Sequence, residues 1–232
     1  MPSLLSPEEW QALVLSVKVG LVATLVSLPF AVGMAVLLAR HAFPGKQIVN
    51  GLVYLPLVLP PVVTGYLLLL TFGRHGAVGA LLERTFGIVF IFRWTGAALA
   101  SAVMGFPLMV RAIRLAVEAV DPRLEQAAST LGASRGWVFL TVTLPLILPG
   151  ILAGAILGFA RALSEFGATI TFVSNIPGQT QTLPLAIYSF LQVPGGDAAA
   201  LRLVVISIVL AMAALIASEV LGARVARRIA GR

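Results

Sequence analysis

Five long apolar stretches run through this chain and limit what it can fold into. They cover about 11–39, 48–72, 95–117, 138–160 and 201–223. Each holds the roughly 20 residues that a helix needs to cross the hydrocarbon layer of a bilayer. Backbone groups inside lipid must find hydrogen-bond partners within the protein, so a spanning stretch of this kind is a helix. The sequence therefore predicts an all-α integral membrane protein with about five transmembrane helices.

The scarcity of charged residues supports this prediction. Only 11% of the 232 residues are charged and 59% are hydrophobic, whereas a soluble domain has about 25% charged residues. So few charges cannot cover a surface that faces water, which excludes a soluble enzyme, a soluble nucleic-acid binder and a disordered chain. Despite the net charge of +7, we expect no nucleic-acid partner. With no cysteine and two histidines, we also expect no metal site and no cofactor.

The basic residues indicate how the chain is oriented. Five crossings place the two termini on opposite sides of the membrane, and cytoplasmic segments carry an excess of Lys and Arg. A cytoplasmic C-terminus puts ten of the 16 basic residues inside, which favours N-out and C-in. The ten are Arg40, Lys46, Arg111, Arg114, Arg123, Arg135, Arg224, Arg227, Arg228 and Arg232. We expect residues 1–232 to form a single transmembrane domain.

Proline, glycine and two short apolar segments add detail to the spans. Segments 87–92 and 183–193 are too short to cross and are predicted to be interfacial or re-entrant. Prolines remove backbone donors, which is tolerated where helices pack on one another or line a wet path. A stripe of small residues at four-residue spacing predicts close contact between helices. The prolines are Pro56, Pro60, Pro61, Pro145 and Pro149, and the glycine stripe is Gly150, Gly154 and Gly158.

The most informative stretch is a cytoplasmic loop at about 118–137. Asp121 is a typical helix cap, Pro122 suits the first helical position, and Gly132 suits a left-handed stop. These signals predict a short helix over 122–131. Its small apolar face, suited to a groove on another protein, consists of Leu124, Ala127, Ala128 and Leu131.

There are two alternative locations for this helix, the membrane surface and the chain's own bundle. A helix lying on a membrane usually combines a Lys- and Arg-rich polar face with large apolar residues. This helix has one arginine, Arg123, and an alanine pair. The pattern therefore favours a partner protein.

Residues 126–145 resemble the loop motif of bacterial ABC importer permeases. The matching residues are Ala127, Ala128, Gly132 and the ending Val142-Thr143-Leu144-Pro145. The usual first residue of that motif is Glu, whereas position 126 is Gln and Glu125 stands one place earlier. The molybdate permease branch is more similar still, through residues 55–66 (LPLVLPPVVTGY), 165–178 (EFGATITFVSNIPG) and 194–196.

This resemblance implies a type I ABC importer permease fold in its five-helix form, in a bacterial inner membrane. The chain would be a homodimeric permease for molybdate or tungstate, working with two copies of an ABC ATPase and a periplasmic molybdate-binding protein. Sulfate and thiosulfate permeases share much of the pattern and remain an alternative. The residues it assigns to ATPase coupling are Glu125, Gln126, Ala127, Ala128, Leu131, Gly132, Leu144 and Pro145.

The chain is not expected to be an enzyme. Its only Gly-Lys pair, Gly45-Lys46, is followed by Gln47 and lacks the upstream glycine of a phosphate-binding loop. The ATP chemistry therefore belongs to a partner.

The anion path is harder to predict, because few cations lie within the spans. Lys18, Arg161 and Arg202 lie near outer helix ends, where basic side chains reach toward the interface. Glu165 is expected to pair with Arg161 at i, i+4, the alternative being an outer gate or a docking role. The candidates for the path or gate are Pro60, Pro61, Thr64, Ser164 and Glu165.

Two rival functions come from other classes. Residues 132–136 match G-x-S-x-G, which suggests a membrane serine hydrolase with Ser134 as nucleophile. That motif requires a strand-to-helix elbow and a nearby histidine, but His75 is predicted on the opposite side of the membrane and His41 in a loop. A secondary transporter would show two similar halves and acidic residues within its spans, and neither is present in this pattern.

Overall fold

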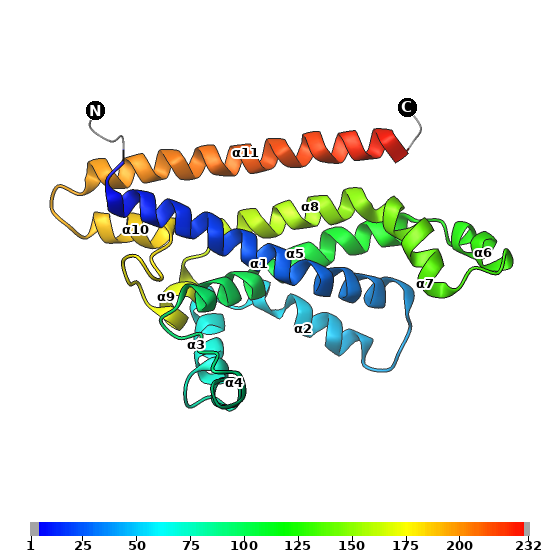
Figure 1. The fold of residues 1–232 in the computed structure, drawn as a ribbon, viewed down its shortest axis with the longest axis horizontal. Helices are drawn as coiled ribbons and strands as arrows, with labels where there is room; N and C mark the ends of the chain where they lie inside the picture. Colours follow the sequence, from blue (N-terminus) through cyan, green and yellow to red (C-terminus); the bar gives the residue numbers. More distant parts are fainter. Residues whose placement is uncertain (1–4, 230–232) are drawn as a thin grey trace.

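The chain folds into helices joined by short loops (Figure 1). A computed structural model describes the backbone of residues 5–229, with side chains except at 218, 219, 221, 223 and 225–229. The elements are α1 (Pro7–Arg40), α2 (Lys46–Val58), α3 (Pro61–Phe72), α4 (Ala77–Phe86), α5 (Trp94–Ala119), α6 (Pro122–Thr130), α7 (Arg135–Val138), the π-helical turn η1 (Phe139–Thr143), α8 (Leu144–Leu163), α9 (Gly167–Val173), α10 (Leu183–Leu191) and α11 (Asp197–Ile229). No strand occurs within 5–229, and the predicted all-α class is confirmed.

Four helical segments are long and apolar enough to cross a membrane. They are Pro7–Arg40, Trp94–Ala119, Arg135–Leu163 and Asp197–Ala217, and a bent pair formed by α2 and α3 raises the number to five. This agrees with the predicted five spans. Of the two short apolar segments, 183–193 contains helix α10, whereas 87–92 is a loop that packs Phe90 edge-on against Phe72.

The predicted stretch 48–72 is not one straight helix. It breaks at Leu59 and Pro60, and α2 and α3 are bent by 117°. Prolines provide the physical reason, since Pro60 and Pro61 have no N–H group to continue the helix. A residue that precedes proline is also pushed toward extended backbone. Leu59 and Pro60 accordingly have ψ angles of 143° and 136°.

The core of the bundle is formed by α1, α5 and α8. Both α1 and α8 pack along α5, and the glycine stripe of α8 faces α5. A Cβ atom added at Gly158 would lie 2.7 Å from Cγ of Met109, and one added at Gly105 would lie 3.2 Å from the carbonyl oxygen of Gly158. The predicted close helix contact is confirmed, and nothing larger than glycine fits there without movement.

The remaining elements surround this core. Helix α11 packs mainly on α8 and α10, while α3 packs on α9. The two chain ends lie at opposite ends of the bundle, and α6 lies at the C-terminal end (Figure 1). An N-out and C-in orientation requires the two ends of the chain to lie at opposite ends of the bundle, as they do here. The basic side chains of Arg227, Arg228 and Arg232 lie outside the described residues.

Candidate coupling loop and paired helix breaks

Helix α6 starts and stops as the sequence predicted. The carboxylate of Asp121 accepts a hydrogen bond of 2.9 Å from the backbone N–H of Arg123, and Pro122 occupies the first turn. The helix ends at Thr130, one residue before the predicted end, and Gly132 has a φ of +85°. The left-handed stop is therefore confirmed.

The apolar face of α6 is left uncovered by the chain itself. None of the nine residues of α6 is buried, and Leu131 directly after it is 89% exposed. Leu124 and Ala127 are also exposed, whereas Ala128 is half-buried. The contacts of α6 are mostly with α7 and η1, so its apolar face does not pack on the bundle.

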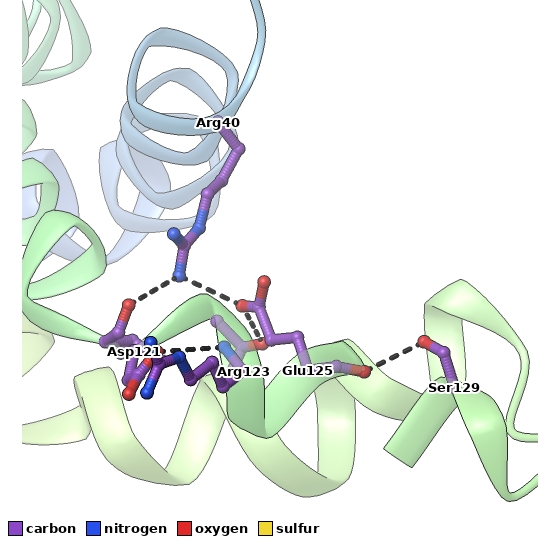
Figure 2. A network of polar contacts seen from close by, with 7 residues as sticks. Arg40, Asp121, Arg123, Glu125 and Ser129 are labelled. Carbon is purple, nitrogen blue, oxygen red and sulfur yellow. Dashed lines mark hydrogen bonds and ion pairs between the residues drawn. The ribbon is translucent and has the colours of Figure 1, made fainter. Parts of the chain in front are cut away.

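Glu125 has a different environment from the rest of α6, because it turns toward its own chain (Figure 2). Its Oε1 atom lies 3.1 Å from Nη2 of Arg40, at the end of α1, and accepts a 2.7 Å hydrogen bond from the hydroxyl of Thr143. Nη2 of Arg40 also donates to the carbonyl of Val120 at 3.2 Å. Gln126 is exposed. Sequence patterns did not predict that Arg40 and Thr143 contact Glu125, because neither is a neighbour of Glu125 along the chain.

The Leu-Pro ending of the loop motif lies in the first turn of α8. The N–H of Leu144 bonds the carbonyl of Phe139, five residues earlier, which makes η1 a π-helical turn. In an α-helix the ring of Pro145 would collide with the carbonyl four residues earlier. The wider turn relieves this conflict and carries Thr143 inward, where it is 3% exposed. Pro145 itself is exposed and Leu144 half-buried.

A second candidate region contains the residues predicted for the path or gate, at the start of α3 and at the end of α8. Pro60 and Pro61 begin α3, and Ser164 ends α8 just before α9. The two short helices pack closely. A Cβ atom at Gly65 of α3 would lie 2.6 Å from the carbonyl oxygen of Ala168, and one at Gly167 would lie 2.8 Å from Cβ of Pro61. The structure thus brings the two breaks together.

Glu165 is buried between these breaks, with 2% of its surface exposed. Its Oε1 accepts a 2.8 Å hydrogen bond from the N–H of Ala168, and its Oε2 forms a 2.8 Å ion pair with Nη1 of Arg161. The predicted i, i+4 pair is confirmed. Thr64 is 5% exposed, and its hydroxyl has no hydrogen-bond partner among the described residues. The Ser164 hydroxyl is exposed and donates to the carbonyl of Arg161.

Each of the three basic residues near outer helix ends has a partner in its own chain. Nζ of Lys18 lies 3.7 Å from the centre of the Trp94 ring, Arg161 pairs with Glu165, and Nη2 of Arg202 lies 2.8 Å from Oε1 of Glu9. These cations stabilise contacts between helices or within one helix. The structure therefore shows two helix ends in close contact and one exposed loop helix.

The fold and the loop motif define the membrane component of a transport system. Residues 27–227 match the family described as the binding-protein-dependent transport system inner membrane component, and the chain belongs to that family. It is a multi-pass inner-membrane component rather than an enzyme. A solved bacterial ABC transporter that imports the polysaccharide alginate shares this fold, with a TM-score of 0.74 at 20% identity, covering 94% of this chain and 80% of that one. The predicted permease fold is confirmed.

Among individual proteins, the chain is similar to the molybdenum transport system permease protein ModB of Escherichia coli (strain K12). The two are 60% identical over 229 residues, which cover 99% of this chain and 100% of the relative. The sulfate transport system permease protein CysW of Synechococcus elongatus is 39% identical, covering 76% of this chain and 62% of the relative. The predicted resemblance to the molybdate branch is confirmed.

The hydrolase alternative does not fit the structure. Ser134 caps α7 by accepting a hydrogen bond of 3.4 Å from the N–H of Trp137. It lies between two helices, and residues 5–229 hold no strand from which a nucleophile elbow could turn.

Proposed function

We propose that this chain is the membrane-spanning permease subunit of an ATP-driven importer for molybdate. The observation that carries the proposal is the 60% identity to a molybdenum permease over nearly the full length of both chains. The 39% identity to a sulfate permease, over a smaller share, makes sulfate the second candidate.

Uptake of labelled molybdate tests the substrate directly. Membranes containing this subunit, its ATPase and the periplasmic binding protein should take up molybdate, and excess sulfate should leave that uptake unchanged. If the same membranes take up labelled sulfate and no labelled molybdate, the sulfate alternative replaces the proposal.

The proposed coupling site is the uncovered face of α6. Leu124 and Leu131 are 49% and 89% exposed on this one face, and apolar residues grouped on an exposed face are typical of a surface that a partner covers. The partner proposed is the ATPase, one copy for each permease of a homodimer. Only the short connections 120–121 and 131–134 separate α6 from α5 and α7. Closure of the ATPase pair would therefore move these helices between inward-open and outward-open states.

Substitutions at this face test the coupling site. Leu131→Glu and Ala128→Glu should abolish co-purification of the ATPase, because each places a charge in an apolar contact. Leu191→Glu is the matched control, since Leu191 is 58% exposed at the opposite end of the bundle. Normal ATPase binding by both α6 variants would contradict the proposed site.

A second copy of the chain is the proposed cover for the break between α2 and α3. The carbonyls of Pro56 and Leu57 have no donor four residues on, because Pro60 and Pro61 lack an N–H. Beside them Val58 is 81% exposed. Irregular backbone at membrane depth must be buried in protein or line a wet cavity, which supports a homodimer.

The proposed path for the anion runs beside the paired breaks, with Pro60, Pro61, Thr64, Ser164 and Glu165 along it. Selection is left to the molybdate-binding protein, which docks at the end of the bundle opposite α6. Thr64→Val should slow uptake about tenfold, since a hydrogen bond to a charged group is worth about 1.5–3 kcal/mol. Thr71→Val is the control, because that exposed hydroxyl already bonds the carbonyl of Leu67 on the same helix. Equal uptake by both variants would remove Thr64 from the path.

A further inference from the structure

The carboxylate of Glu125 connects three parts of the chain that are distant in sequence. Oε1 of Glu125 contacts Arg40 at the end of α1 and Thr143 in the π-helical turn, 85 and 18 residues away. The same guanidinium nitrogen of Arg40 holds the carbonyl of Val120, where α5 ends. The ion pair and the two hydrogen bonds beside it therefore join α6 to the ends of α1 and α5 and to η1. Figure 2 shows the Arg40 side chain reaching toward the Glu125 carboxylate.

This link stands out because α6 has so little other attachment to the bundle. None of its residues is buried. The side chains of Arg40 and Glu125 are 22% and 26% exposed, so the pair is shielded from much of the solvent. A charge-assisted hydrogen bond in partial shielding is stronger and more directional than an exposed ion pair. The polar link can therefore transmit movement that a loose surface contact could not.

The π-helical turn gives the link its geometry. The five-residue spacing between Leu144 N–H and Phe139 carbonyl widens the helix where Thr143 meets Glu125. Single π-turns within helices occur frequently at functional sites. A shift of α6 would therefore act on the π-helical turn η1, which leads directly into α8.

We propose that Glu125 is a positioning residue that transmits movement of α6 directly to α1 and to the π-helical turn. In this view Glu125 faces its own bundle and does not contact the ATPase. The inference rests on the proposed coupling function of α6. Its consequence is that α1, which packs along α5 and α8, moves together with α6 when the ATPase closes.

The test measures how many anions are imported for each ATP hydrolysed. The complete transporter, with its ATPase and binding protein, is placed in proteoliposomes with labelled molybdate. Glu125→Gln keeps the size of the side chain but removes the charge, and Thr143→Val removes the hydroxyl alone. We expect ATPase assembly to be retained and import per ATP to fall about fivefold or more, the lower limit of typical coupling between sites.

The matched control is Glu118→Gln. Glu118 forms a 2.7 Å ion pair with Arg114 near the same end of the bundle, but both residues belong to α5. Arg114 also donates a 2.9 Å hydrogen bond to Oδ1 of Asn50 in α2, and Glu118→Gln leaves that bond in place. The substitution therefore removes no contact between elements, and import per ATP should match that of the unmodified chain.

The outcomes separate this inference from the proposed function. Loss of coupling in Glu125→Gln and Thr143→Val, with a normal Glu118→Gln, supports the link. An unchanged ratio in Glu125→Gln, or an equal loss in all three variants, overturns it. If Glu125→Gln does not assemble, Thr143→Val decides. If the unmodified chain binds no ATPase and imports no molybdate, it is the proposed function that fails.

Discussion

Arg202 and Glu9 form an ion pair of 2.8 Å although 193 residues separate them in the sequence. Glu9 is fully buried, and its carboxylate also accepts a hydrogen bond from the N–H of Ser6, which completes a capping box at the start of α1. The pair therefore joins the first turn of α1 to the first turns of α11. It ties the first and last spans of the chain together at the N-terminal end of the bundle.

Arg202→Met should lower the thermal stability of the purified permease, because it leaves the Glu9 carboxylate buried without its cation. We expect a loss of about 2 kcal/mol, between the roughly 1 kcal/mol of an exposed pair and the 3–5 kcal/mol of a buried one. A thermal melt in detergent measures it. The exposed neighbour Glu8, as Glu8→Gln, is the control. Adding Glu9→Gln to Arg202→Met should restore most of the loss; a double variant that is less stable than either would contradict this account.

Gly65→Ala should separate α3 from α9 and reduce transport. The added Cβ would lie 2.6 Å from the carbonyl oxygen of Ala168, and backbone atoms cannot move aside as a flexible side chain can. Overpacking of this kind costs about 1–3 kcal/mol. Gly33→Ala is the control in α1, where an added Cβ meets no atom within 4 Å. A thermal melt and an uptake assay of both variants test this, and equal behaviour would show that the two helices are not in close contact.

Two substitutions of Glu165 should differ in stability. Glu165→Gln keeps an oxygen for the N–H of Ala168, while Glu165→Ala leaves that buried N–H without its partner. We expect Glu165→Ala to be less stable than Glu165→Gln by about 1–3 kcal/mol, the cost of an unsatisfied buried group. The same variants address the gate. If binding protein loaded with its anion still stimulates the ATPase normally in the Glu165→Gln variant, the Glu165 carboxylate has a structural role and no role in a gate.

Thiol labelling can test the predicted orientation, since the chain has no cysteine of its own. Ala42 follows α1, Gln192 follows α10, and both are exposed at opposite ends of the bundle. With an N-out and C-in orientation, an impermeant maleimide added to intact spheroplasts should label Gln192→Cys and spare Ala42→Cys. Everted vesicles should show the reverse, and the opposite pattern in both preparations would invert the topology.

The sequence predicted the features of the fold that depend on local patterns. Long apolar runs located α1, α5, α8 and α11, since the length of each run is set by the bilayer. Capping residues located α6 within one residue at its end, and the i, i+4 spacing located the pair of Arg161 and Glu165. The break between α2 and α3 was visible as prolines, but the angle between the two helices depends on packing against α9.

The contacts that sequence patterns missed lie between distant elements. The resemblance assigned Glu125 to ATPase coupling, and nothing local indicates that Arg40, 85 residues earlier, would lie beside it. The pair of Glu9 and Arg202 is of the same kind. Such contacts depend on how complete helices pack against one another, and the residue pattern of a single helix does not predict that packing.

The position of α11 has a consequence for biosynthesis. Chains emerge from the ribosome N-terminus first, so α1, α5 and α8 reach the membrane before the final helix is made. Because α11 packs mainly on α8 and α10, it arrives at a docking surface that is already complete. The ion pair between Arg202 and Glu9 is then among the last contacts between spans to form. A chain released before α11 is made would leave that docking surface uncovered, in a state that quality-control proteases can recognise.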